Sequence, residues 1–147
     1  MSARKKSRKK SQQRTWFKNP WLIGLFIVLG LAFAWTWGRN AGSLPLEISV
    51  AEAAAGRDAG AFILDVREPD EWEAFHIPGA TLIPLGQLAA RADELPSGRE
   101  IIVVCRSGNR SAEGRDILLS AGFEQVTSLA GGMLDWQAAG YATVSGP

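Results

Sequence analysis

The stretch that decides the fold runs from residue 101 to residue 111 and reads Ile101-Ile102-Val103-Val104-Cys105-Arg106-Ser107-Gly108-Asn109-Arg110-Ser111. Its first four residues are β-branched and apolar without alternation, which is typical of a central strand buried on both faces of a parallel sheet. A helical pattern follows from Ser111 to Ala121, and Gly122 is expected to end that helix. The stretch therefore predicts a strand, a short polar loop and a helix.

The rest of the chain from Leu44 onward repeats this alternation. Ser49-x-x-Glu52 is a capping-box pattern, which predicts the start of a helix. In chain order we predict a helix at 49–57, a strand at 62–66, a helix at 69–75, a strand at 80–83, a helix at 86–92, a strand at 126–129 and a helix at 132–139. Strands joined by helices predict an α/β domain with a parallel sheet and helices on both faces.

The loop after the strand 101–104 carries the predicted chemistry. Ligands of such sheets bind outside the carboxyl ends of the strands, and Cys105, the only cysteine, lies there. Gly108 and Asn109 tolerate positive φ, so the backbone N–H groups of 106–110 can curl inward into an anion-binding nest. The helix N-terminus, Arg106 and Arg110 add positive charge. All of these favour the thiolate, so we expect Cys105 to be a nucleophile rather than a small buried core residue.

Four motifs in this chain resemble those of rhodanese-homology domains, in order and at the family's spacing. They are Leu64-Asp65-Val66-Arg67-Glu68-Pro69-x-Glu71-Trp72, His76-Ile77-Pro78-Gly79-Ala80, the Cys105–Ser111 loop, and Gly131-Gly132-Met133-x-x-Trp136. The resemblance covers residues 44–143 and implies a five-stranded parallel sheet and sulfurtransferase chemistry through a persulfide on Cys105. One departure is Phe75, which stands where the family often has Gly.

The resemblance also implies the partners of the reaction. A small anionic donor such as thiosulfate would load the sulfur, and a thiol or a cyanide-like acceptor would remove it. We expect Cys105 to carry the sulfur, with substrate binding by Arg106, Ser107, Gly108, Asn109, Arg110, Ser111 and, from the neighbouring strand end, Arg67. Asp65 is expected to orient the loop. Neither a metal nor a cofactor is expected beyond the covalent persulfide, because one His and one Cys provide no ligand cluster.

Other functions compete with this interpretation. The loop is C-x4-R, whereas related cysteine phosphatases and arsenate reductases use C-x5-R, which disfavours a phosphatase. A redox cycle would need an outside thiol, because the chain has no second cysteine. A non-catalytic sulfur carrier or protein-binding module stays open, since its loop would be the same. We interpret His76 as a structural hydrogen-bonding residue and the acidic residues at 68–73 as helix-start and surface charges.

The first 43 residues differ in composition from the rest. The 147 residues carry 16 Lys+Arg and 15 Asp+Glu, but residues 1–19 hold eight of the basic residues and no acidic one. The run from Trp21 to Trp37 is uncharged and would span ~25 Å as a helix, with tryptophans at both ends. We therefore predict a disordered basic tail at 1–19, a transmembrane helix at 20–38, a linker at 39–43 and the rhodanese-like domain at 44–147.

The uneven charge also predicts an orientation. Basic residues before the span favour a cytoplasmic tail, so a single-pass protein of the bacterial cytoplasmic membrane would hold its domain on the extracytoplasmic side. The expected partner of the tail is the lipid bilayer and not nucleic acid, and a membrane protein is a candidate sulfur acceptor. Ala32-Phe33-Ala34 also fits a signal-peptide cleavage site, so cleavage after Ala34 remains an alternative.

Overall fold

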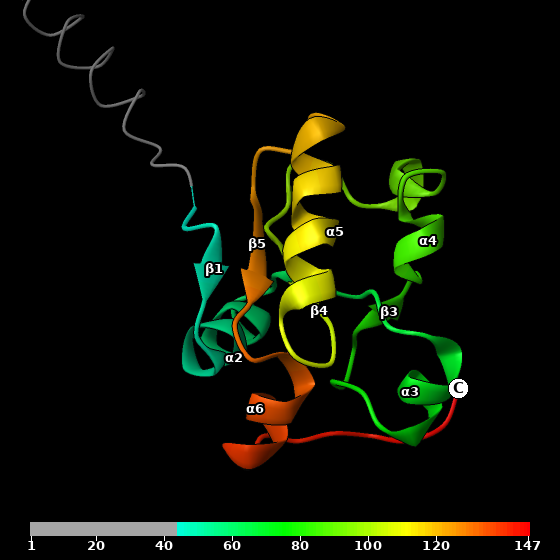
Figure 1. Cartoon of the computed structure of the whole chain (residues 1–147). Helices are drawn as coiled ribbons and strands as arrows, with labels where there is room; N and C mark the ends of the chain where they lie inside the picture. The colour runs from blue at the N-terminus through cyan, green and yellow to red at the C-terminus, as the bar shows by residue number, and fades with distance from the viewer. Residues whose placement is uncertain (1–43) are drawn as a thin grey trace, which may run out of the picture. The chain divides into compact units, whose positions relative to one another are not determined.

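The computed structural model describes residues 44–147, which form an α/β domain (Figure 1). The predicted basic tail, transmembrane helix and linker at 1–43 lie outside the described residues. Among residues 44–147, no helix has the length and apolar character needed to cross a membrane.

The domain is built on one sheet of five parallel strands in the order β1-β5-β4-β2-β3. The strands are β1 (Glu47–Ile48), β2 (Phe62–Asp65), β3 (Thr81–Leu82), β4 (Ile101–Val104) and β5 (Val126–Leu129). The helices are α2 (Val50–Asp58), α3 (Pro69–Ala74), α4 (Leu85–Leu88), the 3-10 helix η1 (Ala92–Glu94), α5 (Asn109–Ser120) and α6 (Gly132–Ala138). The resemblance's five-stranded parallel sheet is confirmed.

The central strand β4 explains why its sequence lacks alternation. Ile101 and Val103 face one apolar cluster together with side chains of α4, η1 and α5, whereas Ile102 and Val104 face a second cluster with side chains of α2 and α6. All four residues are buried. The sheet is therefore covered on both faces, as the continuous apolar run predicts.

The sequence patterns locate most elements, and the differences are local. The strands at 101–104 and 126–129 and the capping box of Ser49 and Glu52 are as predicted. The helix expected at 86–92 is shorter: α4 ends at Leu88, and Arg91 leaves helical geometry (φ −119°, ψ 13°) before η1. Strand β1 has only two residues, too few to produce a readable pattern, and pairs with β5 at the sheet edge.

The carboxyl ends of the strands meet the segments that surround Cys105. The β4–α5 loop carries this cysteine, α3 follows β2, and α6 follows β5. In Figure 1 the loop between β4 and α5, helix α6 and helix α3 lie at the same end of the sheet. The parallel topology thus brings together three of the four motifs found in the sequence.

Candidate active site

Cys105 lies directly after β4 at the bottom of its loop. The residue is 1% exposed. Its Sγ accepts a hydrogen bond from the Gly108 N–H at 3.1 Å and contacts Ser111 Oγ at 3.5 Å. Ser111 Oγ also donates to the Gly108 carbonyl at 2.8 Å, which closes the loop on itself. The Gly108 N–H is therefore the donor that the sulfur accepts from, since the Ser111 hydroxyl donates to the Gly108 carbonyl.

Gly108 is the residue that lets this loop turn. Its φ of +103° lies in the left-handed region, and a Cβ at this position would lie 3.3 Å from the Gly131 nitrogen. Of the two residues that tolerate positive φ, only Gly108 adopts it, because no described residue other than glycine has a positive φ. Asn109 is instead the first residue of α5, so one glycine reverses the chain and the helix begins at once.

The loop is supported from behind by the start of α6. The N–H groups of Met133 and Leu134 donate to the carbonyls of Cys105 and Arg106 at 2.8 and 3.1 Å. Gly132 makes this approach possible, because a Cβ on it would lie 2.3 Å from the Cys105 carbonyl oxygen. Its φ of +59° is also unfavourable for other residues. The Gly131-Gly132 motif therefore lets α6 hold the backbone of Cys105 and Arg106.

Arg110, which ends the C-x4-R motif, is paired with Glu71 of α3. Its Nη1 and Nη2 atoms donate to the two Glu71 carboxylate oxygens at 2.7 and 2.8 Å. These bonds hold the pKa of Glu71 below its ordinary value, and Glu71 in turn raises the pKa of Arg110. Sequence reasoning placed Glu71 among surface charges, and no local signal could have revealed a partner 39 residues away.

Arg67 is buried and bound to Asp65. Its Nε and Nη2 atoms donate to the Asp65 carboxylate at 2.9 and 2.6 Å, and both side chains are 1% exposed. Its other bonds go to the Glu71 carbonyl (3.1 Å), in the middle of α3, and to the Phe75 carbonyl (2.8 Å), directly after that helix. Arg67 thus fastens α3 to the end of β2. Its role in substrate binding, and that of Asp65 in orienting the loop, stay predictions.

A cavity of about 260 Å³ borders this arrangement. Its lining residues are Arg67, Glu71, Ala74, Phe75, Arg106, Leu134 and Gln137. Arg106 is exposed, and none of the ion pairs among residues 44–147 includes it. Larger hollows at residues 97–99 and 121–125 and along α4 and α5 do not include the cysteine loop. Of these three cavities, the one beside Arg106 is therefore the one that borders the cysteine loop.

The remaining predicted residues are His76, which is buried, and Ser107 and Asn109, which are exposed. His76 is buried, stacks on Trp72 with ring centroids 3.6 Å apart, and places Nδ1 3.1 Å from the Trp72 carbonyl oxygen. These contacts agree with a structural role. Ser107 and Asn109 are exposed on the loop. Between residues 44 and 147, no group of three or more His, Cys, Asp or Glu side chains could hold a metal ion.

Known proteins are similar to this chain in sequence. The chain is 40% identical over 99 residues to a putative sulfur carrier protein, YrkF, of Bacillus subtilis (strain 168), a match that covers 67% of this chain and 54% of the relative. It is 36% identical over 77 residues to thiosulfate sulfurtransferase GlpE of Pseudoalteromonas translucida (strain TAC 125), covering 52% of this chain and 73% of the relative. The chain thus spans about half the length of the Bacillus relative.

Solved structures agree with the sequence matches. A rhodanese-related protein from Thermoplasma volcanium superposes with a TM-score of 0.64 at 30% identity, over 68% of this chain and 98% of that one. Thiosulfate sulfurtransferase from Pseudomonas aeruginosa gives a TM-score of 0.63 at 35% identity, over 69% of this chain and 20% of that one. Residues 49–139, which hold the cysteine loop and both segments packed around it, match the model of the rhodanese-like domain, and the chain belongs to that family.

Proposed function

We propose that this protein is a sulfurtransferase in which Cys105 carries sulfane sulfur as a persulfide. The observation that carries the proposal is the 3.1 Å hydrogen bond from the Gly108 N–H to Cys105 Sγ, inside a loop that runs directly into the N-terminus of α5. Such a loop stabilises negative charge on sulfur through backbone donors and the positive end of the helix. The names of the matched relatives, a sulfur carrier and sulfurtransferases, support the same chemistry.

The proposed loading step uses a small anionic donor such as thiosulfate. The Cys105 thiolate attacks the outer sulfur of the donor, and the S–S bond of thiosulfate breaks with its electron pair leaving on sulfite. The product is Cys105–S–S⁻, so the charge near the loop stays negative. Arg106 is exposed and attracts the anionic donor, whereas the Arg110 charge is shared with Glu71.

The unloading step reverses the roles. An acceptor thiolate or cyanide attacks the outer sulfur of the persulfide, and the electron pair of the S–S bond returns to Cys105 Sγ. Thiocyanate or an acceptor persulfide leaves. No proton has to be supplied in either step if the attacking sulfur is already ionised, which is consistent with the absence of a second titratable group among the hydrogen-bond partners of Sγ.

A sulfur carrier that passes its sulfur to a partner protein is the second candidate. It is favoured by the Bacillus relative, which is named a putative sulfur carrier protein. Steady-state thiocyanate production from thiosulfate and cyanide separates the two. Repeated turnover by the wild-type chain and none by Cys105→Ser supports the enzyme. A persulfide that forms once and resists small acceptors supports the carrier.

We also propose that residues 20–38 anchor the chain in the bacterial cytoplasmic membrane, with the domain on the extracytoplasmic side. The support is the uncharged run 21–37 and the eight basic residues before it. Protease added to spheroplasts, but not to intact cells, should digest the domain. Digestion only after the membrane is lysed would contradict this orientation, and the mass of the mature chain shows whether it is cleaved after Ala34.

A further inference from the structure

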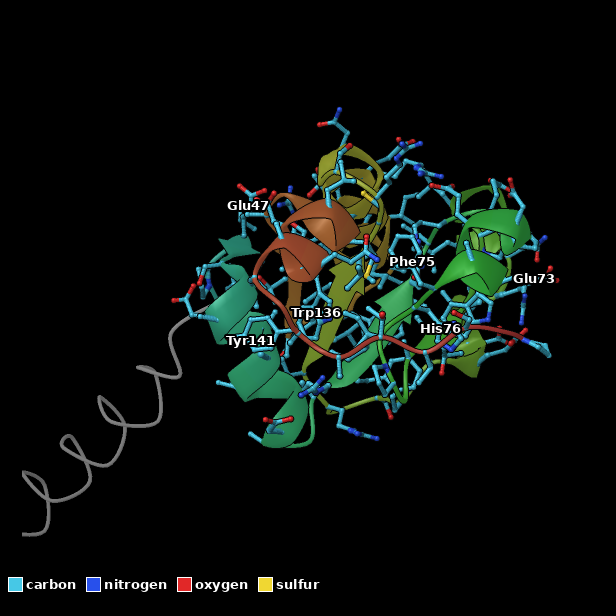
Figure 2. All side chains as sticks on the ribbon, turned by 90° about the horizontal axis from the view of Figure 1, so that it is seen from below. Glu47, Glu73, Phe75, His76, Trp136 and Tyr141 are labelled. Carbon is cyan, nitrogen blue, oxygen red and sulfur yellow. The ribbon has the colours of Figure 1, made fainter. Side chains whose placement is uncertain are left out.

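The last seven residues, 141–147, form a segment that we call the C-terminal strap. It lies beyond residues 49–139, which match the family model. Figure 1 shows it leaving α6 and running beneath the sheet to α3, where the chain ends. Figure 2 shows the same path from Tyr141, past His76, toward Glu73. The strap therefore connects two helices that follow different strands.

At its first end the strap is fastened to α6. The Tyr141 N–H donates to the Trp136 carbonyl at 3.3 Å, and Trp136 Nε1 donates to the Ala142 carbonyl at 3.0 Å. The rings of Trp136 and Tyr141 also pack together, with centroids 4.9 Å apart. Trp136 is fully buried, so this end of the strap is fixed to the core.

At its other end the strap is fastened to the C-terminal part of α3 and the residues after it. Val144 and His76 exchange two backbone hydrogen bonds, at 2.8 and 2.9 Å, in an antiparallel bridge. Ser145 Oγ donates to the Ala74 carbonyl at 2.8 Å, and the Gly146 N–H donates to the Glu73 carbonyl at 2.9 Å. Four hydrogen bonds thus hold residues 73–76 to the strap.

The two helices joined by the strap are the two walls of the cavity beside Arg106. Ala74 and Phe75 line one side, and Leu134 and Gln137 of α6 line the other. Within residues 44–147, no hydrogen bond links α3 directly to α6. The labelled ring of Phe75 lies between the two helices in Figure 2. The strap is therefore a second hydrogen-bonded link between the walls, besides the cysteine loop, which bonds α6 at Met133 and Leu134 and leads to the Arg110–Glu71 pair of α3.

The lining of the cavity indicates what fits there. Glu71 is paired with Arg110, and Arg67 with Asp65, which leaves Arg106 as the charged lining group outside any ion pair of the described residues. Phe75 and the exposed Leu134 provide apolar surface. A volume of about 260 Å³ holds a small molecule. The complementary ligand is a short apolar body that carries an anionic group.

We propose that this cavity binds the body of a carboxylate-bearing thiol acceptor, and that the C-terminal strap sets how well the acceptor binds by holding the two walls together. The proposal rests on the proposed function, because it concerns the unloading step. The acceptor thiolate attacks the outer sulfur of Cys105–S–S⁻, a new S–S bond forms, and the old bond breaks with its electron pair returning to Cys105. Cyanide is too small to need the cavity.

The test uses the full chain, loaded with thiosulfate and freed of excess donor. Unloading is followed by the loss of persulfide mass, with 3-mercaptopropionate, with its uncharged analogue 3-mercapto-1-propanol, and with cyanide. Val144→Pro removes the Val144 N–H that bonds His76, and Val144→Ala is the matched control that keeps both backbone bonds. Ser145→Ala is a milder second variant, which removes only the bond to Ala74.

We expect the wild-type chain to prefer 3-mercaptopropionate over the alcohol, and Arg106→Gln to abolish that preference. In Val144→Pro the half-saturating concentration of 3-mercaptopropionate should rise about fivefold, the effect of losing roughly one hydrogen bond. Its unloading by cyanide should stay unchanged, as should all rates of Val144→Ala. Ser145→Ala should show the same pattern more weakly, and it decides the matter if Val144→Pro does not fold.

Two results would overturn the proposal. Equal rates with the two thiols would show that the cavity does not recognise the carboxylate. A strap variant that slows cyanide and thiol alike would show a merely structural role. Failure of the proposed function looks different, because the wild-type chain would then acquire no persulfide before any acceptor is added.

Discussion

Arg110 and Glu71 form a two-bond ion pair, at 2.7 and 2.8 Å, between the first turn of α5 and helix α3. Arg110 belongs to the cysteine loop, while Glu71 also accepts a hydrogen bond from the Glu68 N–H at the start of α3. Arg67, which follows β2, then bonds the carbonyls of Glu71 within α3 and of Phe75 directly after it. A continuous set of charged contacts therefore holds the loop of Cys105 in place, and part of its positive charge is already neutralised before any substrate arrives.

Replacing Glu71 with Gln should slow the loading of Cys105 with sulfur from thiosulfate. The neutral amide cannot accept both hydrogen bonds from the Arg110 guanidinium, so the cysteine loop loses a contact that holds it in place. We expect a loss of severalfold in the single-turnover loading rate, measured by persulfide mass. Glu73→Gln is the matched control, because Glu73 is exposed on the same helix and its carboxylate makes no ion pair among the described residues. Faster loading in Glu71→Gln would instead show that Glu71 competes with the donor.

The same pair predicts a dependence of stability on pH. The Arg110 hydrogen bonds lower the pKa of Glu71 in the folded state. Its contribution is therefore full above the unfolded value of about 4.3 and is lost as the pH falls through the lower folded value. The pair is partly exposed, so solvent screening limits its contribution to about 1 kcal/mol or less. Urea unfolding should show Glu71→Gln less stable than the wild type at neutral pH, with a gap that closes in strong acid. A gap that widens in acid would contradict this assignment.

Gly132→Ala should destabilise the domain by roughly 2–3 kcal/mol. The new methyl group would clash with the Cys105 carbonyl oxygen, which is a backbone atom and cannot move aside as a flexible side chain could. The positive φ of this residue adds strain. Gly86→Ala is the control, since Gly86 lies in α4 with open space around it and should be neutral or slightly stabilised. The free energy of unfolding in urea measures both. An unchanged free energy of unfolding in Gly132→Ala would mean that α6 does not pack against the cysteine loop as described.

Arg67→Lys should lower the free energy of unfolding by roughly 3–5 kcal/mol, although lysine keeps the positive charge. Lysine cannot bond the buried Asp65 carboxylate and the carbonyls of Glu71 and Phe75 at the same time. Arg99→Lys, at an exposed position, provides the comparison. Thermal unfolding followed by circular dichroism is sufficient to see the difference. If Arg67→Lys stays as stable as Arg99→Lys but binds donor poorly, Arg67 acts on the substrate and not on the fold.

The sequence predicts the local parts of this domain and misses the contacts between distant parts. Strand β4 is readable because burial on both faces imposes an unbroken apolar run, and Ser49 because its capping box is local. Strand β1 is not readable, because two residues define no period. The turn of the Cys105 loop is also predicted, since Gly108 lies within three residues of Cys105.

The contacts that position the loop come from elsewhere in the chain. Glu71 and Gly132 reach it only through the order of the strands, which places the ends of β2, β4 and β5 side by side. The sequence also left open which of Gly108 and Asn109 adopts a positive φ, and only Gly108 does, so that Asn109 begins α5. The contacts that depend on tertiary pairing are therefore the ones that local sequence patterns could not predict.

The central claim is that Cys105 accepts sulfane sulfur, and one measurement tests it directly. The full chain is incubated with thiosulfate, freed of reagent and examined by intact and peptide mass spectrometry, with Cys105→Ser treated in parallel. We predict a gain of one sulfur atom, located on Cys105, reversed by cyanide with release of thiocyanate and absent from the variant. A wild-type chain that folds, remains at its unmodified mass and yields no thiocyanate would contradict it.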